Sequence, residues 1–334
     1  MTLKELIGKK KIANPVNELA IFHQFEIPPT FLPSPQAEPP STRPKILFLD
    51  NPVDVARIAH EIGGRKRPVV FDYGATYGTT FAPRSRENVA KVRGEIAPYE
   101  TVSVVTTRKV ASGWVDQERI HPDVAQSIKD GGLNVLDGVS FIRFPCNQKC
   151  EADLGPDFVN AKKEVQVFIV PESDPLMSSL KSGHNLKAVG VRSANMSGHE
   201  EERFIVGALQ YARKIGAAIV AVRNPKTILS QIKDEKHLAN NQPEKMQRKR
   251  YGSQPIVRLP TADETPAAIT LIRAGNTEPT TIRRLVSKAV PEKVDFVHAN
   301  EKKTTFVRAE FSVDSKVALP GHIRKVLVKN SGVK

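Results

Sequence analysis

Alternating strand-like and helix-like segments from residue 45 onward most constrain the fold of this chain. Short apolar runs, such as 45–49 and 217–222, have the length and composition of buried strands. Segment 51–64 has helical spacing of its apolar residues, with Pro52 in the first turn and two glycines at its end. This alternation predicts an α/β domain with a twisted mixed sheet flanked by helices.

Other segments extend the same pattern along the chain. Apolar runs with strand character and amphipathic segments with helix character follow one another without an internal repeat. The further expected strands are 68–74, 100–107, 165–171, 187–193 and 269–275, and the further expected helices are 85–94, 121–132 and 200–216.

Three parts of different composition indicate the domain organisation. Residues 1–44 form an N-terminal arm and linker with seven prolines between Pro28 and Pro44. Residues 45–285 form the α/β domain, interrupted at about 226–255 by a polar insertion that we expect to be exposed and mobile. Residues 286–334 are expected to be a C-terminal β-rich extension.

The charge balance favours an anionic partner or substrate. The chain has 50 Lys plus Arg against 36 Asp plus Glu, a formal net charge of +14. Within the insertion, the basic cluster Lys245, Arg248, Lys249 and Arg250 is either an RNA- or phosphate-contacting loop or a solvated one.

Several classes of protein are not expected from the sequence. No apolar run approaches the roughly 20 residues of a membrane span, and no secretory signal is recognisable, so we expect a cytoplasmic protein without a membrane partner. The two cysteines, Cys146 and Cys150, are too few for a structural zinc site, and we expect free thiols at a loop and no metal site. The oligomeric state is left open.

Polar residues follow several of the expected strands at the point where each strand ends. Ser193 and Asn195 follow the apolar run that ends near Val191, within VGVRSANMSGHEE, and Arg273 ends another run. Ligands of open α/β sheets bind beyond the carboxyl ends of the strands. Each segment taken alone is most simply a connecting loop. Taken together, the segments indicate a binding site.

The order of these motifs resembles the YrdC-like family, the threonylcarbamoyl-AMP synthases of tRNA modification. The segment Lys91-Val92-Arg93 with Pro98 fits the family's Lys-x-Arg motif and the proline that follows it. The segment 193–198, SANMSG, fits its Ser-x-Asn motif, and 273–275, RAG, fits its Arg-x-Gly. The resemblance covers roughly residues 45–285 and identifies the chain as a divergent member.

The resemblance implies an activity and a set of site residues. The activity is ATP-dependent synthesis of threonylcarbamoyl-AMP, or a related carbamoyl or acyl adenylate, from an amino acid, bicarbonate and ATP, with Mg²⁺ bridging the phosphates. Cationic side chains would offset the repulsion between the anionic substrates. The implied residues are Lys91 and Arg93 for catalysis and phosphate binding, Ser193, Asn195 and Arg273 for ATP and phosphate binding, and Thr76 and Tyr77 for the amino acid.

Departures from the family pattern leave the substrate open. Residues 72–75, Asp-Tyr-Gly-Ala, replace the family's Pro-Thr-x-Thr, so Asp72 introduces a carboxylate where the family has proline. The amino acid or acceptor, and the survival of catalysis, are therefore undetermined. The alternatives are a non-catalytic RNA- or tRNA-binding protein on the same fold and an enzyme that transfers a carbamoyl group to a small metabolite.

Overall fold

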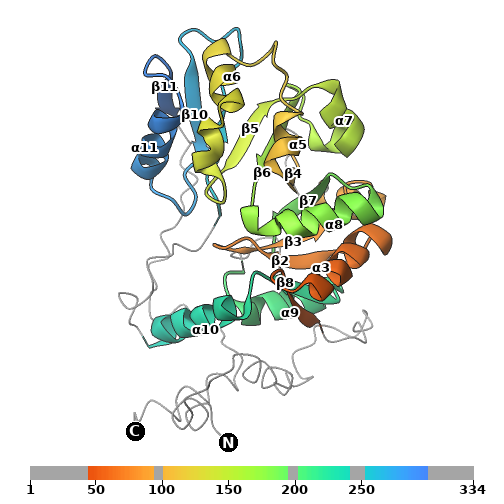
Figure 1. Cartoon of the computed structure of the whole chain (residues 1–334). Helices are drawn as coiled ribbons and strands as arrows, with labels where there is room; N and C mark the ends of the chain where they lie inside the picture. Colours follow the sequence, from red (N-terminus) through yellow and green to blue (C-terminus); the bar gives the residue numbers. More distant parts are fainter. Residues whose placement is uncertain (1–43, 94–100, 195–201, 241–252, 300–334) are drawn as a thin grey trace, which may run out of the picture. The chain divides into compact units, whose positions relative to one another are not determined.

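A computed structural model of the chain describes residues 44–93, 101–194, 202–240 and 253–299. The proline-rich arm, most of the C-terminal extension and the basic cluster at 245–250 lie outside these ranges. Figure 1 shows the described elements in colours that follow the sequence.

One mixed sheet of eleven strands organises the described residues, in the order β1-β8-β2-β3-β7-β4-β6-β5-β9-β10-β11. Parallel and antiparallel pairs both occur, so the predicted α/β fold with a mixed sheet is confirmed. The strands are β1 (Lys45–Phe48), β2 (Val69–Asp72), β3 (Tyr77–Phe81), β4 (Ser103–Thr106), β5 (Phe141–Pro145), β6 (Glu164–Phe168), β7 (Ala188–Ser193), β8 (Ile219–Val222), β9 (Ile256–Arg258), β10 (Ala268–Arg273) and β11 (Asp295–His298).

The helices lie in the connections between strands and pack against the sheet. Helix α3 packs against α8 and β1, while α9 and α10 contact each other and β8 (Figure 1). The α-helices are α3 (Pro52–Ala59), α4 (Arg86–Arg93), α5 (Arg108–Ser112), α6 (Pro122–Lys129), α7 (Gln148–Leu154), α8 (Asp174–His184), α9 (Ile205–Ile215), α10 (Pro225–Ala239) and α11 (Pro279–Ala289).

Apolar burial explains why the strongest sequence patterns form these elements. In one core cluster, Ile58 of α3 and Leu180 of α8 pack with Phe71 of β2 and Ala221 of β8. A second cluster surrounds Trp114, whose indole Nε1 also donates a hydrogen bond to an Asp153 carboxylate at 2.9 Å. Burial of this kind is the main favourable contribution to folding.

Strands β1, β8 and β2 are mutually parallel and end at one edge of the sheet. Lys45 lies opposite Ile219, and Val70 lies opposite Val220. The residues that follow these strands therefore meet at one edge, where α/β sheets bind their ligands.

The insertion expected at 226–255 is not an exposed segment throughout. Residues 225–239 form helix α10, whose N-terminus is capped by Asn224: its side-chain oxygen accepts from the Thr227 backbone N–H at 3.1 Å. Ile228, Gln231 and Asp234 on this helix are buried. The prediction of an exposed segment is wrong for this part of the chain, because three polar residues of the helix, Thr227, Gln231 and Asp234, are buried together with Ile228.

The chain also continues as part of the sheet beyond residue 285. The predicted boundary between 285 and 286 falls inside α11, and β11 pairs in parallel with β10. The rest of the expected β-rich extension, from residue 300 onward, lies outside the described residues.

Cys146 and Cys150 are both free and buried rather than lying at a surface loop. Cys146 forms an isolated antiparallel β-bridge with Val115. Cys150 belongs to helix α7, whose N-terminus is capped by Asn147. The loop prediction is therefore wrong, because Asn147 starts a helix within the polar Asn-Gln-Lys stretch between the two thiols.

Candidate functional site

Two of the predicted site segments meet at the junction of β3 and β7. Gly78 of β3 lies opposite Ser193 of β7, and the backbone N–H of Ala194 donates to the carbonyl of Tyr77 at 2.9 Å. The Tyr77 segment at the start of β3 and the Ser193 segment at the end of β7 therefore lie side by side, although they are far apart in the sequence.

Glu202 closes this strand end through its backbone. Its carbonyl accepts from the Tyr77 N–H at 2.8 Å and from the Thr76 hydroxyl at 3.0 Å, and its own N–H donates to Ala194. Sequence reasoning did not single out Glu202, because backbone hydrogen bonds of this kind leave no mark on residue type.

The side chain of Tyr77 is fully buried and is held by helix α10. Its hydroxyl donates to Oε1 of Gln231 at 2.8 Å. On the same strand, the hydroxyl of Thr79 is hydrogen-bonded to that of Tyr211 in helix α9 at 3.0 Å. Polar contacts from two helices thus cover β3, which explains how a strand with few apolar side chains is buried.

Two carboxylates lie close to this covered strand. Burial raises the pKa of Glu202 above its ordinary value. Burial, and secondarily the neighbouring Glu202 carboxylate, raise the pKa of Glu235 in α10 to about 7. Glu235 therefore changes its protonation near neutral pH, unlike an ordinary glutamate.

The predicted phosphate residues differ in how far the structure describes them. Lys91 and Arg93 lie in the last turn of α4, and only their backbone is described. Asn195 lies outside the described residues. Ser193, at the end of β7, is half-buried.

Arg273 acts on the backbone next to β9. Its Nε and Nη2 donate to the carbonyl of Gln254 at 3.2 and 3.0 Å. The side-chain amide of Gln254 in turn donates to the carbonyl of Tyr73 at 3.1 Å. Arg273 thereby supports a link between Gln254, two residues before β9, and the turn that follows β2.

Asp72, which stands where the family pattern has proline, is almost completely buried at the end of β2. One of its oxygens accepts from the Gly74 N–H at 2.8 Å. The other accepts from Nε of Arg223 at 3.3 Å, and Nη1 of Arg223 lies 3.9 Å from Glu172. Asp72 therefore shapes the β2–β3 turn and holds a guanidinium at the same edge.

A cavity of about 270 Å³ lies beside this turn. Gly74 and Ala75 line it from the turn, and Gln254 and Asn276 line it from the segments that flank β9 and β10. Within the described ranges, no group of three or more His, Cys, Asp or Glu side chains is arranged to hold a metal ion. None of the helices in these ranges combines the length and apolar character of a membrane span.

Several solved structures are similar to this chain in fold. A hypothetical protein from Streptococcus mutans UA159, smu.1377c, is 12% identical, covers 78% of this chain and 99% of its own, and has a TM-score of 0.52. Sua5 from P. abyssi, solved in complex with L-threonine, has a TM-score of 0.49 at 12% identity, and E. coli YciO has 0.48 at 10%. The fold of this chain is similar to that of smu.1377c.

Coverage differs among these structures. The match with Sua5 extends over 76% of this chain but 62% of the Sua5 chain, whereas that with YciO extends over 71% and 97%. No protein-family model matches the sequence, and no curated protein matches it. On this fold, the junction where Tyr77 of β3 lies beside Ser193 of β7 is the candidate site.

Proposed function

We propose that this chain uses ATP to form threonylcarbamoyl-AMP, or a related carbamoyl or acyl adenylate, from an amino acid and bicarbonate, for tRNA modification. The observation that carries the proposal is the pairing of Gly78 with Ser193. It joins two motifs whose order in the sequence resembles the YrdC-like family. The likeness of the fold to known structures supports the same proposal.

The cationic residues supply the main chemistry in this proposal. Lys91 and Arg93 neutralise the phosphates and bicarbonate, and they stabilise negative charge that develops as pyrophosphate leaves. Ser193 and Asn195 donate hydrogen bonds to the phosphates. Because acid–base steps contribute little to this reaction, most of the acceleration comes from positioning the substrates.

Mg²⁺ enters the proposal together with ATP. Mg²⁺ usually keeps several waters and is held through substrate phosphates, so it needs few ligands from the protein. Thr76 and Tyr77 define the amino-acid side of the site. Since both are tied to the Glu202 carbonyl, we propose that this part of the site is rigid.

Pyrophosphate release tests the proposal. The full-length protein is incubated with ATP, Mg²⁺, bicarbonate and each of the common amino acids, and pyrophosphate is measured with and without bicarbonate. We expect release that requires both bicarbonate and one amino acid. Lys91→Ala should reduce the rate at least about a hundredfold, as removal of a transition-state charge partner does.

A matched variant controls for the loss of a positive charge. Lys129 is exposed at the end of α6, and Lys129→Ala should leave the rate unchanged. No release with any amino acid would overturn the enzyme proposal. Tight, salt-dependent RNA binding without turnover would instead support the RNA-binding alternative.

A further inference from the structure

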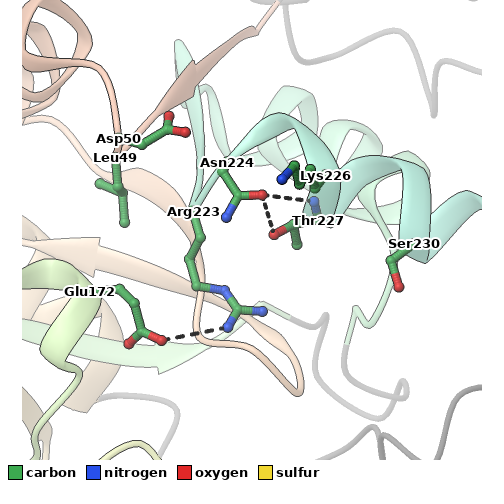
Figure 2. Close-up of a pocket in the computed structure, with 8 residues that line it drawn as sticks. All are labelled: Leu49, Asp50, Glu172, Arg223, Asn224, Lys226, Thr227 and Ser230. Atoms are coloured by element: carbon green, nitrogen blue, oxygen red, sulfur yellow. Dashed lines mark hydrogen bonds and ion pairs between the residues drawn. The ribbon is translucent and has the colours of Figure 1, made fainter. Parts of the chain in front are cut away.

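A larger cavity, of about 610 Å³, lies where β1 and β8 end and helix α10 begins. Asp50 lines it after β1, Arg223 lines it after β8, and Lys226 and Thr227 line it from the first turn of α10 (Figure 2). Glu172, which follows β6, also lines it, and both Glu172 and Arg223 line the smaller cavity as well. Because α10 lies within the insertion, this cavity is built partly from residues outside the motifs that resemble the family.

The charged side chains of this cavity balance one another. Two cations, Arg223 and Lys226, line it together with two carboxylates, Asp50 and Glu172. Asp50 and Lys226 are exposed and form no ion pair with any other residue in the described ranges. A ligand of one charge sign would therefore gain from one pair and be repelled by the other.

Arg223 is fixed by a buried partner. Asp72, with a side chain 1% exposed, accepts from Nε of Arg223 at 3.3 Å. In Figure 2 the guanidinium points toward Glu172, with Nη1 at 3.9 Å from its carboxylate. The terminal nitrogens of Arg223 therefore lie at the lining that this cavity shares with the smaller one, and a guanidinium there can bind a carboxylate or phosphate.

Glu172 is suited to the opposite role. Its side chain is 54% exposed, and 3.9 Å from Arg223 is too long for a strong hydrogen bond. Its carboxylate therefore has free acceptor capacity for a ligand ammonium group.

We propose that this cavity binds a small zwitterion, with its anionic group on Arg223 and its ammonium group on Glu172. Asp72 acts as a positioning residue that holds the guanidinium. The shared chemistry is a carboxylate or phosphate on a short chain that also carries an amine. Binding at this cavity does not rest on the proposed adenylate chemistry, because it requires neither ATP nor turnover.

Calorimetric titration of the full-length protein without ATP tests this site. The probes are glycine and O-phosphoethanolamine, which separate carboxylate from phosphate, and acetate, inorganic phosphate and ethylamine, which carry one charge each. We expect one zwitterion to bind about tenfold or more tightly than its single-charge fragments, the scale of one charge-assisted hydrogen bond. Equal binding of an anion alone would overturn the proposal.

Variants assign the binding to this cavity. Glu172→Gln and Arg223→Gln should each weaken the zwitterion about tenfold. Glu172→Gln should not weaken binding of the matching anion, because it removes a carboxylate that repels that anion. Glu172 is largely exposed, so its substitution should not disturb folding. Arg57→Gln and Glu118→Gln change exposed charges elsewhere and serve as controls.

The outcomes for the cavity and for the proposed function are separable. Zwitterion binding that is lost in Glu172→Gln, without adenylate formation, would support the cavity and overturn the enzyme proposal. Adenylate formation together with zwitterion binding that Glu172→Gln and Arg223→Gln leave unchanged would overturn the cavity proposal alone.

Discussion

The hydroxyl of Tyr77 donates a hydrogen bond to Oε1 of Gln231 at 2.8 Å, which joins strand β3 to helix α10 in a buried environment. Tyr77→Phe removes the donor and leaves a buried amide oxygen without this partner. We expect the free energy of unfolding, measured by urea denaturation, to fall by about 1–3 kcal/mol. The double variant Tyr77→Phe, Gln231→Leu should lose less than the two single losses added together, because it removes both partners. Additive losses would contradict the coupling.

Gly78 has no room for a side chain at the β3–β7 junction. A Cβ at this position would lie 2.6 Å from the Tyr73 ring and 2.9 Å from the Arg192 carbonyl. We expect Gly78→Ala to lower the free energy of unfolding by about 1–3 kcal/mol, the range seen for overpacking. Gly183→Ala is the control, since open space surrounds that helical position, and it should be neutral or stabilising. Equal stability of the two variants would contradict the described packing.

Glu235 should make stability depend on pH near neutrality. Its pKa in the folded protein is about 7, above the ordinary value of 4.5. The folded state therefore retains a proton that the unfolded state releases, and stability is lost as the pH rises from the ordinary value through about 7.

Glu235→Gln removes this titration. We expect it to raise the free energy of unfolding at pH 8 by about 1–3 kcal/mol and to have little effect at pH 4. Denaturant unfolding at both pH values measures the difference. The same change at both pH values would show that Glu235 does not titrate between them.

Arg273 is expected to need its planar fork of donors. Two of its nitrogens hold one carbonyl, that of Gln254. Lysine keeps the charge but presents a single ammonium group, so Arg273→Lys should reduce the free energy of unfolding by about 1–2 kcal/mol. Arg284→Lys, at an exposed position of α11, is the control. A thermal unfolding midpoint equal to that of the control would contradict this role.

The sequence predicts well those elements that are held in place by burial of their own apolar side chains. Strand β1 is an apolar run, and helix α3 combines apolar spacing with a proline in its first turn and an asparagine cap. Both elements occur where the sequence predicts them. Strand β3 was not expected, because Tyr-Gly-Thr-Thr-Phe has few apolar residues. Its stability comes from backbone pairing with β2 and β7 on both sides.

The candidate site shows the same division. The order of the motifs anticipated that the Tyr77 and Ser193 segments would lie together, and they share a strand end. Neither Glu202, which acts through its backbone, nor the partnership between Asp72 and Arg223 was predicted. Contacts between residues distant in sequence require the fold, because no local pattern encodes them.

Isotope tracing tests the central claim most directly. The protein is incubated with ATP, Mg²⁺, the active amino acid and bicarbonate labelled with a heavy carbon isotope, and the nucleotide products are analysed by mass spectrometry. The account predicts an amino-acid carbamoyl adenylate that carries the label and is strongly reduced in Lys91→Ala but not in Lys129→Ala. An absence of labelled adenylate with every amino acid, from folded protein, would contradict it.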